Sequence, residues 1–250
     1  MEQEDDARQP APVVPPWGHC FKRTGTDEPA TIELTQLDVK LFALRSSLTY
    51  VGPSTVTAPR EVGPASLPTT DLTSVPGPMR WFVSPYGLHT PAALLHDRLV
   101  GEEAPEGFHR ADADRFFRDM LDSLGVPLLR RYLMWTAVAY GTRWSAGGPR
   151  WVGMLVWTAL AVFGMFSLGA GLVTWSLPWL AVAVVLPFPA AVLWGKQYGG
   201  GVLAAGSGPW LALPALIAAL GYGIYWLLEQ TLQRLPITGE RRPPARPEDF

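Results

Sequence analysis

The sequence has few charged residues and a single cysteine. Asp, Glu, Lys and Arg make up 17% of the 250 residues, whereas an ordinary soluble domain contains about 25%. The deficit lies in residues 151–228, where Lys196 is the only such charge. This distribution excludes a chain that is one soluble domain throughout and a chain that is wholly disordered. The single cysteine, Cys20, excludes an internal disulfide and an all-cysteine metal site.

The first residues lack the pattern of a targeting segment. Residues 1–20 are acidic and then proline-rich, whereas a secretory signal needs a basic start and a transit peptide is rich in arginine. We expect these residues to form a disordered tail, because they cannot bury enough apolar surface to offset the entropy of ordering. A net charge of −2 gives no reason to expect nucleic acid as a partner.

The charge-poor region consists of apolar segments of the length that crosses a bilayer. These are residues 152–172, 177–193 and 211–228, and about 20 apolar residues cross the hydrocarbon core as a helix. Tryptophan favours the headgroup level, and it flanks all three segments at Trp151, Trp175, Trp179, Trp194, Trp210 and Trp226. The sequence therefore predicts an α-helical membrane region of about three spans in residues 151–228, with the lipid bilayer as a partner.

The number of crossings depends on the second segment. Pro187 and Pro189 lie inside it, and each removes a backbone donor, so the segment is either a kinked crossing or a re-entrant element. Three crossings would place the polar, Pro- and Arg-rich tail, residues 229–250, outside the cell, and a re-entrant segment would place it inside. We favour three crossings.

Basic residues before the first span indicate the orientation of the chain. Such residues favour the cytoplasmic side, and here they are Arg130, Arg131, Arg143 and Arg150. We therefore predict a multi-pass protein of the cell membrane, with residues 21–150 in the cytoplasm.

Small residues at four-residue spacing allow helices to approach closely. They occur in the third span as Ala215, Ala219 and Gly223, and in the first as Ser167 and Gly171. A second copy of the chain, or another protein, could bind to these faces.

Residues 21–150 read as a small soluble α+β domain, in which N-terminal strands precede three helices. Residues 28–62 mix β-branched, aromatic and polar residues, which is typical of strands. After a long loop, helices are predicted from Thr90, from about Ala111 to Leu124, and after Pro127. The third of these helices could pack against the rest of the protein or lie on the membrane surface, and we expect packing.

Five pieces of this region occur in a recognisable order: LTYV, TDLTSVP, AALLHDRL, RADADRFF and YLMWTAVAYGTRW. Over about residues 40–145, they resemble a family of short bacterial and phage proteins catalogued as domain of unknown function 1353. The most specific matching residues are Thr70, Asp71, Ser74, Pro76, His96, Asp97, Arg110, Ala113 and Asp114. The family has no established activity, so the resemblance implies a shared domain and no particular reaction.

Four of these residues are candidates for catalysis: His96, Asp97, Asp71 and Asp114, with Ser74 and Arg110 in support. If His96, Asp71 and Asp114 converge, they could bind a divalent metal ion or form an acid–base pair. The alternative is structural. His96 would pair with Asp114 and Asp97 with Arg110, while Asp71 would bond to nearby backbone amides.

Two functions follow from these alternatives. The first is an integral membrane protein whose cytosolic domain is an interaction or scaffold module. The second is a membrane-tethered hydrolase, metal-dependent or acid–base, that uses the four candidate residues.

Overall fold

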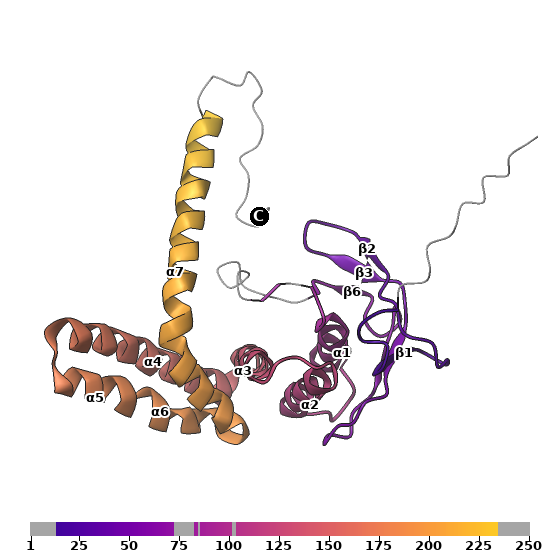
Figure 1. Ribbon diagram of the computed structural model, residues 1–250, viewed down its shortest axis with the longest axis horizontal. Coiled ribbons are helices and arrows are strands. Elements are labelled where there is room, and N and C mark those ends of the chain that lie inside the picture. The colour runs from indigo at the N-terminus through magenta and orange to yellow at the C-terminus, as the bar shows by residue number, and fades with distance from the viewer. Residues whose placement is uncertain (1–13, 73–82, 85, 102–103, 235–250) are drawn as a thin grey trace, which may run out of the picture.

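The computed structural model describes residues 14–72, 83–84, 86–101 and 104–234 (Figure 1). Its N-terminal part contains short strands in two antiparallel sheets. The strands are β1 Phe21–Arg23, β2 Leu34–Gln36, β3 Phe42–Leu44, β4 Leu48–Tyr50, β5 Glu61–Val62 and β6 Thr69–Thr70. The strand order is β1-β4-β5 in one sheet and β2-β3-β6 in the other. The predicted α+β class is confirmed, and β1 and β6 extend the strands beyond the predicted range.

Three helices follow: α1 Thr90–Val100, α2 Arg110–Ser123 and α3 Leu128–Ser145. Helices α1 and α2 pack against the sheets, and α3 packs on α2. The inner face of α2 carries Phe116, Phe117, Met120 and Leu121, all of which are buried. Phe116 meets the buried ring of Tyr50 from β4 edge-on, with ring centroids 5.5 Å apart. The helices and sheets therefore share one hydrophobic core.

Part of the predicted disordered tail belongs to this core. Cys20 is only 3% exposed, and the indole Nε1 of Trp17 donates to the carbonyl of Ala30 over 2.7 Å. The prediction was wrong for residues 14–20, because Trp17 and Cys20 supply apolar surface that the acidic and proline-rich composition concealed. Residues 1–13 lie outside the described residues.

The charge-poor region begins with a helical hairpin. Helix α4, Gly148–Thr174, is followed by α5 Leu177–Val185, α6 Pro187–Ala190 and the 3-10 helix η2 Ala191–Gln197, which return alongside α4 (Figure 1). The returning segment, α5 to η2, is interrupted at Pro187 and Pro189, where these prolines were expected to disturb a helix. The indole of Trp157 on α4 donates to the carbonyl of Pro187 over 3.3 Å.

Helix α7, Tyr198–Arg234, completes the described chain and contains Pro209 and Pro214. It leaves the α4–η2 hairpin at a steep angle (Figure 1). Two helical stretches are long and apolar enough to cross a bilayer, Gly148–Thr174 and the interrupted stretch Leu177–Leu232. The structure thus contains helices suited to a membrane, whereas three separate spans stay a prediction. The predicted polar tail is helical up to Arg234, and the rest of it lies outside the described residues.

Candidate functional site

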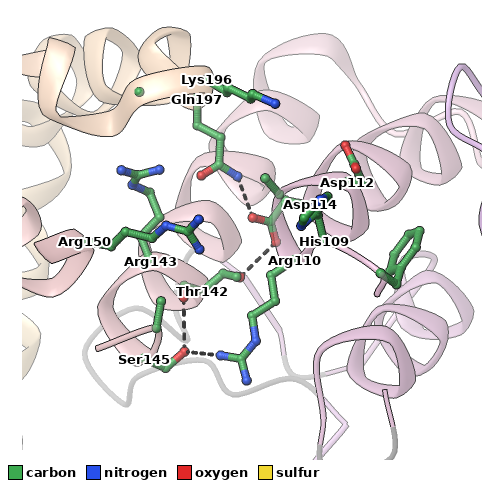
Figure 2. Close-up of a pocket in the computed structure, with 14 residues that line it drawn as sticks. His109, Arg110, Asp112, Asp114, Thr142, Arg143, Ser145, Arg150, Lys196 and Gln197 are labelled. Atoms are coloured by element: carbon green, nitrogen blue, oxygen red, sulfur yellow. Dashed lines mark hydrogen bonds between the residues drawn. The ribbon is translucent and has the colours of Figure 1, made fainter. Parts of the chain in front are cut away.

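Asp114 is the centre of a buried polar network. One oxygen of its carboxylate, Oδ1, accepts hydrogen bonds from His96 Nε2 over 2.9 Å and from Thr142 Oγ1 over 2.8 Å. The other oxygen, Oδ2, accepts from Gln197 Nε2 over 2.5 Å. Figure 2 shows Thr142 and Gln197 reaching the carboxylate from two different elements. Because each carboxylate oxygen has a donor, Asp114 can remain fully buried without the cost of an unsatisfied charge.

The elements of the fold explain why these side chains meet. His96 lies on the buried face of α1, and its ring packs 5.3 Å from the ring of Phe117, on the same face of α2 as Asp114. Thr142 lies near the end of α3, where its hydroxyl is also 2.9 Å from the carbonyl of Val138. The α4–η2 hairpin brings Gln197 back to the domain. The network therefore joins the domain to the apolar part of the chain.

Asp97 belongs to an adjoining group with different chemistry. Its Oδ2 accepts from Thr70 Oγ1 over 3.1 Å, and the same hydroxyl accepts from the backbone N–H of Leu72 over 2.9 Å. Burial raises the pKa of Asp97 to about 6; the charge of Asp71 contributes to the rise, and His96 and the Thr70 hydrogen bond oppose it. Asp97 is thus a carboxyl group whose pKa lies well above that of an ordinary aspartate.

The candidate residues consequently divide into two neighbouring groups. The structural pairing of His96 with Asp114 is confirmed. The predicted pairing of Asp97 with Arg110 is wrong: Arg110 donates to the hydroxyl of Ser145 over 3.3 Å, because its position at the start of α2 directs it toward the end of α3.

The catalytic roles of the candidate residues stay predictions. Ser74 lies outside the described residues. Within the part of the chain that the structure describes, no group of three or more His, Cys, Asp or Glu side chains is placed to hold a metal ion.

Two residues of the network, Thr142 and Gln197, are absent from the sequence-based site. Thr142 lies at the YGTRW end of YLMWTAVAYGTRW, one of the pieces that resemble the family. This position was only a weak indication that Thr142 belongs to a site. The only signal for Gln197 was that it is a polar residue, next to Lys196, in a region that is otherwise apolar. Its partner is 83 positions away, and sequence spacing does not reveal contacts of this range.

The comparisons with known proteins agree with the resemblance noted above. Residues 43–138 match the family described as "Protein of unknown function (DUF1353)". The match covers β3 through most of α3, and so includes His96, Asp97 and Asp114 but neither Thr142 nor Gln197. No curated protein and no solved structure matches the chain.

Proposed function

We propose that this protein is an integral membrane protein whose α+β domain is an interaction module fixed against its own membrane helices. The observation that carries the proposal is the hydrogen bond from Gln197, at the end of the hairpin, to Asp114 in the domain. A flexibly tethered domain would need no such buried bond.

Aromatic packing supports the same arrangement. Trp157 of α4 and Trp194 of η2 meet edge-on with ring centroids 5.1 Å apart. Tyr140 of α3 lies against Trp194, and its hydroxyl is 3.0 Å from that of Thr158 on α4. Since α3 also packs on α2, it connects the core of the domain to that of the hairpin.

The proposed topology follows from the hairpin. Its two ends, near Arg150 and Lys196, lie beside the domain, and its turn at Trp175 lies at the far end of α4. We propose that α4 and α5–η2 cross the bilayer and return, with residues 21–150 in the cytoplasm. Alkaline carbonate extraction of membranes containing the full chain should leave it in the pellet. Its release into the supernatant would contradict integral membership.

The interaction surface that we propose is the tip of the β2–β3 hairpin. Leu37, Val39 and Leu41 are 53%, 55% and 40% exposed there, and three large apolar side chains within five residues form an unusual exposed cluster. We propose another protein as the partner.

A photo-crosslinking residue at Val39 tests this surface in cells. We expect one discrete protein adduct. It should disappear when Leu37 and Leu41 are both changed to Asp. As a control, a crosslinking residue placed at the exposed Asp27 instead of Val39 should give no such adduct. Adducts with lipid alone, or an adduct that these changes leave unaltered, would contradict an interaction module at this tip.

The second candidate, a membrane-tethered hydrolase, is favoured by one observation. Asp97, with its pKa raised to about 6, would be suited to general acid–base catalysis near neutral pH, and His96 is adjacent to it. Hydrolysis of a panel of ester and phosphoester substrates, lost in Asp97→Asn with thermal stability retained, would support this function. Stoichiometric divalent metal in the purified wild-type chain, lost in His96→Ala, would support its metal-dependent form.

A further inference from the structure

A cavity of about 590 Å³ lies beside Asp114, between the domain and the start of the membrane hairpin. Four different elements, α2, α3, α4 and η2, each contribute one basic residue to it: Arg110, Arg143, Arg150 and Lys196. Figure 2 shows Arg110 extending on one side of the cavity and Arg143 and Arg150 on the other. The chain thus gathers distant cations around one space.

The cavity's own carboxylates, Asp112 and Asp114, neutralise these cations only in part. Asp112 is ion-paired with Arg115, outside the cavity wall, and both oxygens of Asp114 are occupied by His96, Thr142 and Gln197. Within the described residues, no carboxylate lies within ion-pairing distance of the four basic side chains. Four positive charges against two carboxylates leave a formal excess of two.

Arg143 shows the electrostatic consequence. Burial and the neighbouring charge of Arg150 lower the pKa of its guanidinium, while Asp114 opposes this effect. One guanidinium nitrogen donates to the carbonyl of Leu193 over 2.9 Å, but Nε is buried and has no partner among the described residues. A bound anion would offset the repulsion between these cations.

The cavity lies at the level expected for lipid headgroups. Trp144 and Trp151, on either side of the junction between α3 and α4, are partly exposed and have ring centroids 6.0 Å apart. Indole rings mark the membrane–water interface. Beyond them, Val152 and Val192 expose apolar surface on the two arms of the hairpin, where acyl chains could lie. Basic pockets at the cytoplasmic end of membrane helices are suited to anionic headgroups.

We propose that this cavity binds the phosphate of an anionic phospholipid headgroup from the cytoplasmic leaflet. The inference rests on the proposed membrane location. Guanidinium groups form two parallel hydrogen bonds with phosphate oxygens, and three arginines on separate elements can surround one headgroup. A free phosphate ion has the same chemistry, but it would make no use of the apolar surface beside the cavity.

Native mass spectrometry of the full chain in detergent tests the site, with phosphatidylglycerol and phosphatidylcholine of identical acyl chains as probes. We expect phosphatidylglycerol to bind at least tenfold more tightly than phosphatidylcholine. In the double variant Arg110→Gln/Arg150→Gln, this preference should be lost. Arg130→Gln is the matched control, because Arg130 is an exposed arginine of α3 that does not line the cavity, and it should keep the preference.

Equal binding of the two lipids, or a preference that survives the double variant, would overturn the proposal. Displacement of phosphatidylglycerol by millimolar inorganic phosphate would overturn the lipid as the source of the phosphate. If the double variant unfolds, the single variant Arg150→Gln takes its place in the binding test. Arg150 is exposed, so its replacement should not disturb folding. Carbonate extraction of the same proteins separates the two proposals. If the protein stays in the pellet but shows no lipid preference, the headgroup site is refuted and the proposed membrane location is not.

Discussion

At the residue scale, Asp114 is a fully buried carboxylate that accepts three side-chain hydrogen bonds, and its removal should destabilise the fold. Asp114→Ala leaves His96 and Gln197 without their acceptor, whereas the Thr142 hydroxyl keeps the carbonyl of Val138. Each buried unsatisfied group costs about 1–3 kcal/mol. We expect a loss of about 2–4 kcal/mol in the free energy of unfolding, measured by thermal melting in detergent. Asp112→Asn, at a partly exposed position on the same helix, should change it by less than about 0.5 kcal/mol. Equal melting temperatures for Asp114→Ala and the wild type would refute the network.

Asp97 leads to a prediction about pH. Its pKa is raised from 3.8 to about 6 in the folded protein, so the folded state binds a proton more tightly than the unfolded state does. This group's contribution therefore favours folding below about pH 4 and is lost as the pH rises from about 4 to about 6. Asp97→Asn removes the charge, and it should stabilise the protein by the order of 1–3 kcal/mol at pH 7.5 and by little at pH 4.

Melting curves of Asp97→Asn and the wild type across pH 4–8 measure this difference. The exposed Glu106→Gln serves as the control and should follow the wild type at every pH. A stabilisation by Asp97→Asn that is the same at pH 4 and pH 7.5 would show that Asp97 does not titrate in this range.

How far the sequence predicts the site depends on the distance between the residues. His96 and Asp114 are only 18 positions apart, on consecutive helices with clear apolar faces, so their pairing could be anticipated. Asp97 was assigned to Arg110 on the basis of opposite charge, but in the structure Thr70 supplies a neutral donor from a strand. Gln197 could not be found, since nothing local to it indicates which part of the domain the hairpin meets.

At the scale of the elements, the close packing of α4 on α5 depends on glycine in α4. A Cβ at Gly171 would lie 2.7 Å from Leu180 Cδ2 and 3.0 Å from its backbone nitrogen. Gly171→Val should therefore separate α4 from α5 and lower the melting temperature by several degrees. Gly169→Val is the matched control, because a Cβ there meets nothing within 4 Å. Equal melting temperatures for the two variants would contradict the close packing.

The small residues Ser167 and Gly171 were predicted to offer a face to another protein or a second copy of the chain. In the structure both are buried, and Gly171 packs on α5 of the same chain. The spacing indicates close helix contact, but it does not distinguish a neighbouring segment from a separate molecule. The corresponding face on α7, with Ala215 and Ala219, stays a prediction.

Helices were easier to predict than strands for a physical reason. Pro91 and Pro127 mark helix starts. The apolar residues of α2 repeat at helical spacing within fourteen consecutive residues, so the pattern can be seen in the local sequence. The strands are two or three residues long and depend on partners elsewhere: β1 pairs with β4 more than twenty positions away. Such short strands contain too little alternation to be recognised from their own residues.

At the scale of the whole molecule, a domain that matches the DUF1353 family over residues 43–138 is joined to the α4–η2 hairpin by the buried hydrogen bond from Gln197 to Asp114. Sidedness of the hairpin can be measured with single cysteines in a Cys20→Ala background. Cys20 itself is unsuitable as a reporter, because it is buried and its burial raises the pKa of its thiol to about 11.

The most direct measurement is labelling of Glu106→Cys, Ser176→Cys and Gly199→Cys with an impermeant maleimide in intact and lysed cells. These positions lie in the domain, at the turn of the hairpin and just after η2. We expect Ser176→Cys to be labelled in intact cells, and Glu106→Cys and Gly199→Cys only after lysis. Labelling of Ser176→Cys and Glu106→Cys from the same side of the membrane would contradict a hairpin that crosses and returns.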